Sequence, residues 1–400
     1  MSFEFHVSVA EHRAAITALV GGPVPGWSVL DHHALGRRLA ADLVAADGLP
    51  RFDNSAMDGY AVHPADADQR EFPVVGDVPA GVAPAFELER GEAARVMTGA
   101  RLPLGTVAVV PVERTDASPT GPAPKQVLIS QGVCAGRHVR HRGEEVSTGT
   151  TIAVDGSVVT PALIALGRSV GCARARVYSA LRVAVVATGA ELVDPSREPG
   201  LGSIHESNSD MVAALALSAG CIAARVLTCD DEPKRLRMLL DDLAASGEVD
   251  LVITTGGVSA GAFEVVRQVC EPLETFEFAH LAMQPGGPQG LGRWQGLPVV
   301  CLPGTPGGAF VAFQVLVRPA LESRHGTPPP IARTASFQGR SRSMRAGKMQ
   351  FLTSELHDDG TVTLPQGRHL AALVAANALL EVPAEVDRLV EGDVVRVHPL

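Results

Sequence analysis

Residues 250–261, with the sequence DLVITTGGVSAG, constrain the fold of this chain more than any other stretch. They begin as a short β-branched apolar run, which is typical of a strand buried on both faces. The two adjacent glycines that follow, Gly256 and Gly257, can adopt backbone angles closed to other residues. Successive N–H groups in such a turn form a concavity for an anion, and a helix expected from about residue 263 would add the partial positive charge of its N-terminus. An ordinary strand-to-helix turn is the alternative that this stretch alone leaves open.

Apolar strands and helices alternate on both sides of this stretch. Strands are expected at residues 181–187, 222–228 and 297–302, and helices at residues 209–219, 233–245 and 307–321. This alternation predicts a doubly wound, mostly parallel α/β sheet with right-handed crossovers. Polar clusters follow the strands at residues 188–191, 230–231, 254–261 and 303–306. Because such sheets bind ligands beyond the carboxyl ends of their strands, these clusters predict a binding site.

The flanking regions have a different texture, rich in short β-like runs. A helix is expected over residues 6–20, and a second over residues 31–39 with Asp31 as its N-cap. Residues 40–46 fit a strand and a continuation of the second helix equally well. Short strands are expected at residues 73–78, 92–98 and 107–113. After a proline-rich linker at 327–330, runs at residues 349–356, 361–364, 379–382 and 393–398 predict a small all-β domain. The fold class is therefore α/β plus β-rich domains.

Charge and cysteine usage exclude several classes of protein. A net charge of -10 argues against general nucleic-acid binding and against an anionic membrane surface. The amino end shows neither a signal peptide nor a membrane span, so the cytoplasm is the expected location. The six cysteines are scattered among apolar residues without metal-ligand spacing, and we expect them to be small core residues.

Residues 50–62 form an unusually polar segment, PRFDNSAMDGYAV. A bend capped by Asp53, with Asp58 and Gly59 as a turn pair, would explain the glycine. It would not explain why two carboxylates flank an Ala-Met insertion.

These motifs together resemble those of the molybdopterin molybdenumtransferase family, the molybdenum insertases that include the gephyrin E domain. Residues 53–62 are similar to the family's DNSAMDGYAV motif, and residues 97–100 to its Met-Thr-Gly-Ala. Residues 255–261 resemble its Ser-Gly-Gly-Val-Ser-x-Gly loop with Thr255 for the serine, and residues 303–306 its Pro-Gly-Asn-Pro with Thr305 for the asparagine. The resemblance extends over nearly the full length. It implies insertion of molybdate into adenylated molybdopterin, with release of AMP and help from a divalent cation, here expected to be Mg²⁺.

The resemblance also implies an architecture. We expect an N-terminal mixed domain of residues 1–48 and 147–180, an inserted β-rich domain of residues 49–146, an α/β molybdopterin-binding domain of residues 181–326, and a C-terminal β domain of residues 331–400. It implies a homodimer whose site is shared between subunits, a small-molecule pterin substrate, and the molybdopterin adenylyltransferase as a candidate partner.

Carried over by motif, the catalytic residues would be Asp58, Thr98, Glu191 and Asp230. Carboxylates would repel anionic substrates unless a cation lay between them, so Asp58, Glu191 and Asp230 are expected to be Mg²⁺ ligands. The residues expected to bind the substrate are Thr188, Gly256, Gly257, Ser259, Glu264, Pro285, Pro303, Gly304, Pro306 and Arg368.

The chain departs from the family pattern at several charged positions. The family's Lys-Pro-Gly-Lys-Pro is replaced by residues 284–288, QPGGP, so both lysines are missing, and Glu264 replaces an aspartate. Losing a charged hydrogen bond costs about 1.5–3 kcal/mol. Arg368 or Lys348 could restore part of the charge. Two alternatives stay open: a non-catalytic paralogue that binds molybdopterin or a partner protein, and an unrelated α/β nucleotide-binding protein. The second is disfavoured because the loop matches neither Gly-x-Gly-x-x-Gly nor a P-loop.

Overall fold

The computed structural model describes residues 7–259, 261, 264–328, 331–366 and 370–400. The chain divides into two compact units. The large unit comprises Met1–Gly26, Gly36–Ala40 and Val177–Leu400, and the small unit comprises Trp27–Leu35 and Ala41–Arg176. The four domain boundaries expected from the sequence stay predictions. No helix among the described residues is both long and apolar enough to cross a bilayer.

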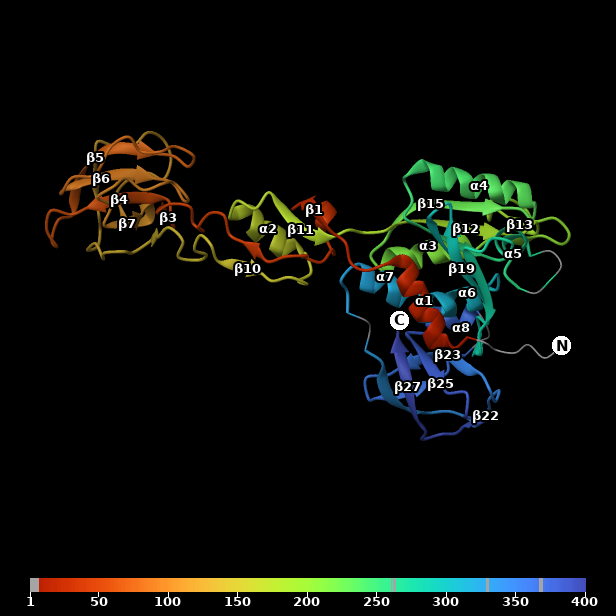
Figure 1. Cartoon of the computed structure of the whole chain (residues 1–400). Coiled ribbons are helices and arrows are strands. Elements are labelled where there is room, and N and C mark those ends of the chain that lie inside the picture. The colour runs from red at the N-terminus through yellow and green to blue at the C-terminus, as the bar shows by residue number, and fades with distance from the viewer. Residues whose placement is uncertain (1–6, 260, 262–263, 329–330, 367–369) are drawn as a thin grey trace. The chain divides into compact units, whose positions relative to one another are not determined.

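The large unit contains a six-stranded sheet (Figure 1). Its strand order is β15 (Ile222–Cys229), β12 (Arg182–Thr188), β16 (Leu251–Thr255), β20 (Leu297–Leu302), β19 (Pro288–Trp294) and β17 (Phe276–His280). The first four strands are parallel, whereas β19 and β17 run antiparallel to their neighbours. The predicted doubly wound, mostly parallel sheet is therefore confirmed, with an antiparallel hairpin added at one edge.

Helices cover both faces of this sheet. One apolar core contains side chains from α1 (Val9–Val20), α3 (Asn208–Ser218) and the helical segment of residues 306–324 (Figure 1). The other contains side chains from α4 (Pro233–Ser246) and α5 (Val265–Cys270). In α4 the buried residues Leu236, Leu240 and Leu243 recur at the spacing of one helical face. Strand β16 is buried along its whole length because it lies between the two layers.

The closing helix expected over residues 307–321 forms in three parts. They are α6 (Pro306–Ala312), the π-helical turn η3 (Phe313–Val317) and α7 (Arg318–Arg324). Pro319 lies in the first turn of α7, where it can donate no backbone hydrogen bond. The change in hydrogen-bond pattern just before this proline is consistent with that missing donor.

The prediction of a second helix over residues 31–39 is wrong. Only the 3₁₀ turn η1 (His32–Ala34) forms, although Asp31 does cap it by accepting the His33 N–H at 2.9 Å. Gly36 has φ 77°, a left-handed conformation that ends the turn. The ambiguous residues 40–46 contain β2 (Leu43–Val44), which pairs with β10 (Thr151–Ala153).

The small unit is built around a five-stranded sheet. Its order is β7 (Ala108–Pro111), β4 (Gly59–His63), β6 (Glu92–Val96), β5 (Glu71–Val78) and β8 (Gln126–Leu128). Gly59 opens β4, and a Cβ there would lie 2.0 Å from the Val110 carbonyl oxygen, so only glycine fits. Outside the sheet lie η2 (Val112–Arg114), α2 (Pro161–Ser169) and the pair formed by β3 (Asn54–Ser55) and β9 (Val139–Arg140). A further two-stranded ribbon joins β1 (Pro25–Val29) to β11 (Arg174–Tyr178).

The C-terminal part of the large unit is a second six-stranded sheet. Its order is β18 (Met283–Gln284), β23 (Met349–Leu356), β24 (Thr361–Thr363), β21 (Arg333–Phe337), β27 (Val394–Pro399) and β25 (Ala378–Val382), with β23 also pairing with β25. Smaller pairs join β22 (Arg342–Ser343) to β26 (Arg388–Leu389), and β13 (Leu192–Val193) to β14 (Ile204–His205). The region is not wholly β, because α8 (Leu370–Ala375) interrupts it. Since β18 precedes β19 in the chain, the segment holding Gln284 ties the α/β sheet to this region.

His12 in α1 makes the stability of the fold depend on pH. Its side chain is buried, its Nε2 has no hydrogen-bond partner among the described residues, and burial lowers the pKa of His12 from 6.5 to about 4. Between these values the unfolded chain takes up a proton that the folded chain excludes, so stability falls as pH falls. We expect His12 to contribute a loss of roughly 2 kcal/mol between pH 7 and pH 5.

The measurement is chemical denaturation of the parent and of His12→Leu at both pH values. The variant should show a smaller drop in the free energy of unfolding than the parent. An equal drop in the two proteins would mean that His12 is not held neutral by the fold.

Candidate functional site

A pocket of about 620 Å³ opens at the carboxyl ends of the parallel strands in the large unit. It gathers polar residues that are far apart in the sequence. The sequence-predicted residues that line it are Thr188, Glu191, Gly256, Gly257, Ser259, Glu264, Pro303, Gly304 and Pro306. Four predicted polar clusters therefore meet in one place, as the strand order requires.

The glycine loop after β16 requires both of its glycines. Gly256 has φ 95° and Gly257 φ 66°. A Cβ at Gly256 would lie 2.5 Å from the Thr188 carbonyl oxygen, and one at Gly257 would lie 2.9 Å from the Val266 nitrogen. Side chains at either position would thus clash with backbone as well as strain the turn.

The loop is less open to anions than the sequence suggested. The Gly256 N–H donates to the Leu302 carbonyl oxygen at 3.1 Å, and the Ser259 N–H donates to the Glu264 carboxylate at 2.9 Å. These two backbone donors are already engaged, so the predicted concavity of free N–H groups is wrong for them. Glu264 sits at the N-cap position of α5, where its charge is also favoured by the helix dipole.

The two aspartates after β15 lie in different surroundings. Asp230 accepts the Glu232 N–H at 3.2 Å and pairs with Arg235, and it is not among the residues lining the pocket. Asp231 does line the pocket, and its carboxylate accepts the Ala190 N–H at 3.0 Å. The carboxylate that shares the pocket with Glu191 is therefore that of Asp231, which the sequence analysis placed in a polar cluster but not among the site residues.

Glu206 and Asn208 are further pocket residues that the sequence reasoning missed. Both are buried. Glu206 accepts the N–H groups of Asn208 and Ser209 at 2.6 and 2.9 Å, which satisfies the first turn of α3. The signal was present: Ser207, Asn208 and Ser209 are helix-capping residue types just before an apolar periodic run.

Asn208 ties the ends of β16 and β20 together. Its Nδ2 donates to Thr255 Oγ1 at 3.1 Å and to the Gly304 carbonyl oxygen at 2.7 Å. Thr255 Oγ1 in turn donates to the Pro303 carbonyl oxygen at 2.9 Å. Asn208 Oδ1 is buried and has no hydrogen-bond partner among the described residues. The pocket floor is thus held by a side-chain network with one acceptor left over.

Pro285 lies on a second pocket of the large unit, of about 1050 Å³, which shares Thr305 and Pro306 with the first. Arg342 also lines it, whereas Arg368 lies outside the described residues. At the positions of the missing lysines, Gln284 Oε1 is buried without a partner among the described residues. A Cβ at Gly287 would lie 2.8 Å from His280 Nε2, so the His280 ring fills the space that a larger residue 287 would need.

Asp58 and Thr98 lie together in the small unit. Asp58 Oδ1 accepts the Thr98 N–H at 2.6 Å and the Thr98 hydroxyl at 2.8 Å. The backbone hydrogen bond, followed by the hydroxyl, holds the pKa of Asp58 below its usual value, so this exposed carboxylate stays charged in mildly acidic solution. The two motifs thus meet in one hydrogen-bonded pair, in which Asp58 carries the charge.

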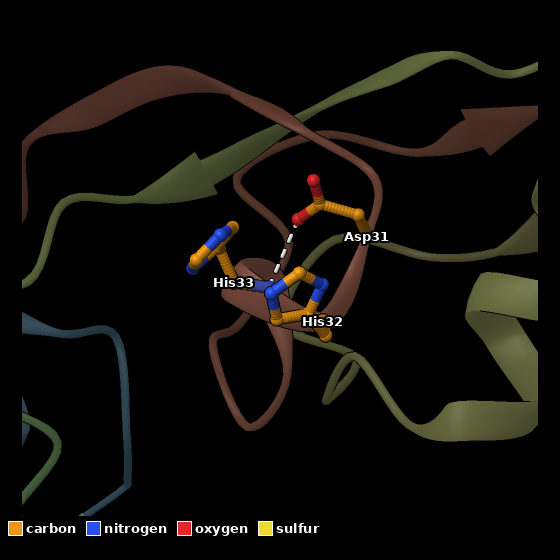
Figure 2. A group of neighbouring side chains, drawn as sticks. All are labelled: Asp31, His32 and His33. Atoms are coloured by element: carbon orange, nitrogen blue, oxygen red, sulfur yellow. Dashed lines mark hydrogen bonds between the residues drawn. The ribbon is translucent and has the colours of Figure 1, made fainter.

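The predicted metal ligands do not form a compact cluster. Among the described residues, the group of three whose ligand atoms all lie within 4.8 Å of one another is Asp31, His32 and His33 (Figure 2). Glu191 and Asp231 offer two carboxylates in the large-unit pocket, and Asp58 belongs to the small unit.

We predict that Asn208→Leu lowers the free energy of unfolding by about 1–3 kcal/mol, because the Gly304 carbonyl and the Thr255 hydroxyl lose a buried donor. Urea denaturation measures this. Ser218→Ala is the control, since that exposed hydroxyl donates to the Leu215 carbonyl oxygen of its own helix. A loss no greater than that of the control would contradict the structural role of Asn208.

Comparisons with known proteins cover almost the whole chain. Residues 7–171 match the family described as MoeA N-terminal region (domain I and II), and residues 184–323 match the family described as Probable molybdopterin binding domain. A Mycobacterium tuberculosis protein named Molybdopterin molybdenumtransferase 2 is 40% identical over 98% of this chain and 99% of its own. One from Haemophilus influenzae, named Molybdopterin molybdenumtransferase, is 30% identical over 92% of each chain. The crystal structure of the molybdopterin biosynthesis moea protein from Pyrococcus horikosii superposes with a TM-score of 0.74 at 26% identity, covering 98% of both chains.

Proposed function

Because the chain belongs to the molybdopterin molybdenumtransferase family, we propose that it inserts molybdate into adenylated molybdopterin and releases AMP, a late step of molybdenum cofactor biosynthesis. The observation that carries the proposal is the pocket where Thr188, the Gly256–Gly257 turn and the Pro303–Pro306 turn meet. Its volume of about 620 Å³ suits a small-molecule substrate.

The charges of this pocket favour a cation-assisted reaction. Its described lining includes the carboxylates of Glu191, Glu206, Asp231 and Glu264 and no lysine or arginine. Both carboxylate oxygens of Glu206 accept hydrogen bonds, and Glu264 holds the Ser259 N–H of the glycine loop. Asp231 uses only Oδ2, for the Ala190 N–H, so its other oxygen and the Glu191 carboxylate are the atoms proposed to hold Mg²⁺ directly or through water. Bound there, the ion would offset the negative charge of the phosphate and molybdate groups. Asp230 stays a candidate ligand only if its pair with Arg235 opens.

The proposed Mg²⁺ ligands can be tested by comparing variants of the two adjacent aspartates and of Glu191. Glu191→Gln and Asp231→Asn should weaken Mg²⁺ binding at least about tenfold, because each removes a charged oxygen ligand. Asp230→Asn should weaken it less, since Asp230 is paired with Arg235. Calorimetric titration with Mg²⁺ measures the affinity, and AMP release at varied Mg²⁺ measures the consequence. If Asp230→Asn is the more damaging of the two aspartate variants, Asp230 and not Asp231 is the ligand.

We further propose a homodimer in which Asp58 and Thr98 of one subunit act on the substrate held by the other. The exposed, negatively charged Asp58 is suited to a role outside its own unit. The molybdopterin adenylyltransferase is the proposed supplier of substrate, in the cytoplasm. Mixing inactive Asp58→Ala with inactive Ser259→Ala should restore part of the AMP release through heterodimers carrying one intact site. No recovery after co-expression would remove the shared-site proposal.

The positions of the missing lysines give a further prediction. Gln284→Lys should tighten molybdate binding by adding a positive charge, whereas Gly287→Lys should do so only together with His280→Ala, because His280 Nε2 would lie 2.8 Å from the new Cβ. Equilibrium binding of molybdate measures both. If Arg368 compensates in the parent, Arg368→Ala should couple to Gln284→Lys by about 0.5–3 kcal/mol in a double-mutant cycle. An additive cycle would exclude that compensation.

The second candidate function is a non-catalytic paralogue that binds molybdopterin or a partner protein. Gln284 and Gly287 favour it, because neither can supply the positive charge of a lysine. Purified protein incubated with adenylated molybdopterin, molybdate and Mg²⁺ should release AMP in step with molybdate consumption. Binding of adenylated molybdopterin without AMP release would make the paralogue the better description.

A further inference from the structure

A second polar cluster belongs to the small unit, and none of its residues lines a pocket discussed so far. Asp31, His32 and His33 each offer one ligand atom, and these atoms all lie within 4.8 Å of one another (Figure 2). The two imidazole rings are tilted against each other, with centroids 3.9 Å apart and an interplanar angle of 40°. The three residues are consecutive, with Asp31 at the N-cap of the 3₁₀ turn that contains His32 and His33.

The turn itself fixes the carboxylate beside the rings. Asp31 Oδ1 accepts the His33 N–H at 2.9 Å, as the dashed line in Figure 2 marks, and this leaves the second carboxylate oxygen for another partner. Both histidines are exposed, and neither imidazole hydrogen-bonds to a described residue. Their rings can therefore turn about their side-chain bonds without disturbing the backbone.

We propose that Asp31, His32 and His33 bind a borderline divalent transition-metal ion such as Zn²⁺. Two imidazole nitrogens and a carboxylate oxygen are a ligand set that suits zinc, copper and nickel, whereas Mg²⁺ prefers oxygen ligands alone. In a tetrahedral zinc site neighbouring ligand atoms lie about 3.4 Å apart, so the present spacing needs only side-chain rotation to close. Water would complete the coordination. The site is separate from the proposed Mg²⁺ site and does not rest on the proposed function.

Because the three proposed ligands are consecutive in the sequence, metal binding has to be measured directly rather than through thermal stability. Residues that are adjacent in the chain stay near one another after unfolding, so the unfolded chain can also bind the ion, and the ion will raise the melting temperature little. Direct binding is therefore the informative measurement, and loss of binding in variants is the informative result.

The experiment is a Zn²⁺ competition titration of the full-length chain against a chromophoric chelator. His32→Gln and His33→Gln should each weaken binding at the tightest exposed site at least about tenfold, since each removes one of three ligands. Asp31→Asn keeps a side-chain oxygen for the cap and should weaken binding by a smaller factor. His357→Gln is the matched control, because that exposed imidazole hydrogen-bonds to Thr363 Oγ1 at 2.9 Å and is not in the Asp31 cluster, so its loss should leave binding there unchanged.

A second readout identifies the ligands. With one equivalent of Cu²⁺, electron paramagnetic resonance of the parent should show coupling to two imidazole nitrogens, and each histidine variant should show one fewer. Equal Zn²⁺ affinity in the parent and both histidine variants would overturn the proposal, as would unchanged nitrogen coupling in both. An affinity for Mg²⁺ that matches that for Zn²⁺ would also overturn it, because it would assign binding to carboxylates alone.

Discussion

The close approach of the Gly256 backbone to the end of β12 is the constraint on which the site depends. A Cβ at Gly256 would lie 2.5 Å from the Thr188 carbonyl oxygen, and one at Gly304 would lie 3.2 Å from the Gly256 Cα. The chain segments that follow β12, β16 and β20 can therefore pack this closely only because Gly256 and Gly304 have no side chains. Asn208 then bonds to the two loops on either side, through Thr255 and Gly304. The pocket walls are thus set by backbone packing, and its polar groups are carried by the loops that this packing positions.

The elements that local sequence determines were predictable. Strands β12, β15, β16 and β20 follow from apolar β-branched runs, and the two loop glycines from the turn that must follow β16. The helix over residues 31–39 failed because Gly36 adopts a left-handed conformation, which no periodicity in the neighbouring residues reveals. The sequence also did not reveal in which direction the side chains that follow a strand point. Asp230 and Asp231 are adjacent and chemically identical, but Asp230 pairs with Arg235 in the first turn of α4 whereas Asp231 accepts the Ala190 N–H, and the sequence does not reveal these partners.

The electrostatics of the large-unit pocket are unusual for a site proposed to bind anions. Its described lining offers carboxylates and hydroxyls without lysine or arginine. Part of the negative charge is already compensated, because Glu206 accepts N–H groups at the start of α3, Glu264 accepts the Ser259 N–H of the glycine loop, and Asp231 accepts the Ala190 N–H. The negative charge that remains, on Glu191 and on the second oxygen of Asp231, gives a reason why a cation would be needed for substrate binding. At the positions of the two missing lysines, Gln284 is neutral and the His280 ring occupies the space beside Gly287, so the cationic contribution has to come from elsewhere in the site.

The motif DNSAMDGYAV combines a structural and a chemical requirement in adjacent residues. Gly59 begins β4 in contact with the Val110 carbonyl oxygen and must lack a side chain, and Tyr60 and the next two residues are fully buried in the sheet. Asp58 comes just before the point where the chain enters this core, so it stays exposed while its backbone is anchored. The Thr98 N–H and hydroxyl, which follow the neighbouring strand β6, then hold the carboxylate in one orientation. The buried start of β4 thus fixes the backbone beside an exposed carboxylate whose orientation is already set. This explains why the glycine and the aspartate occur together.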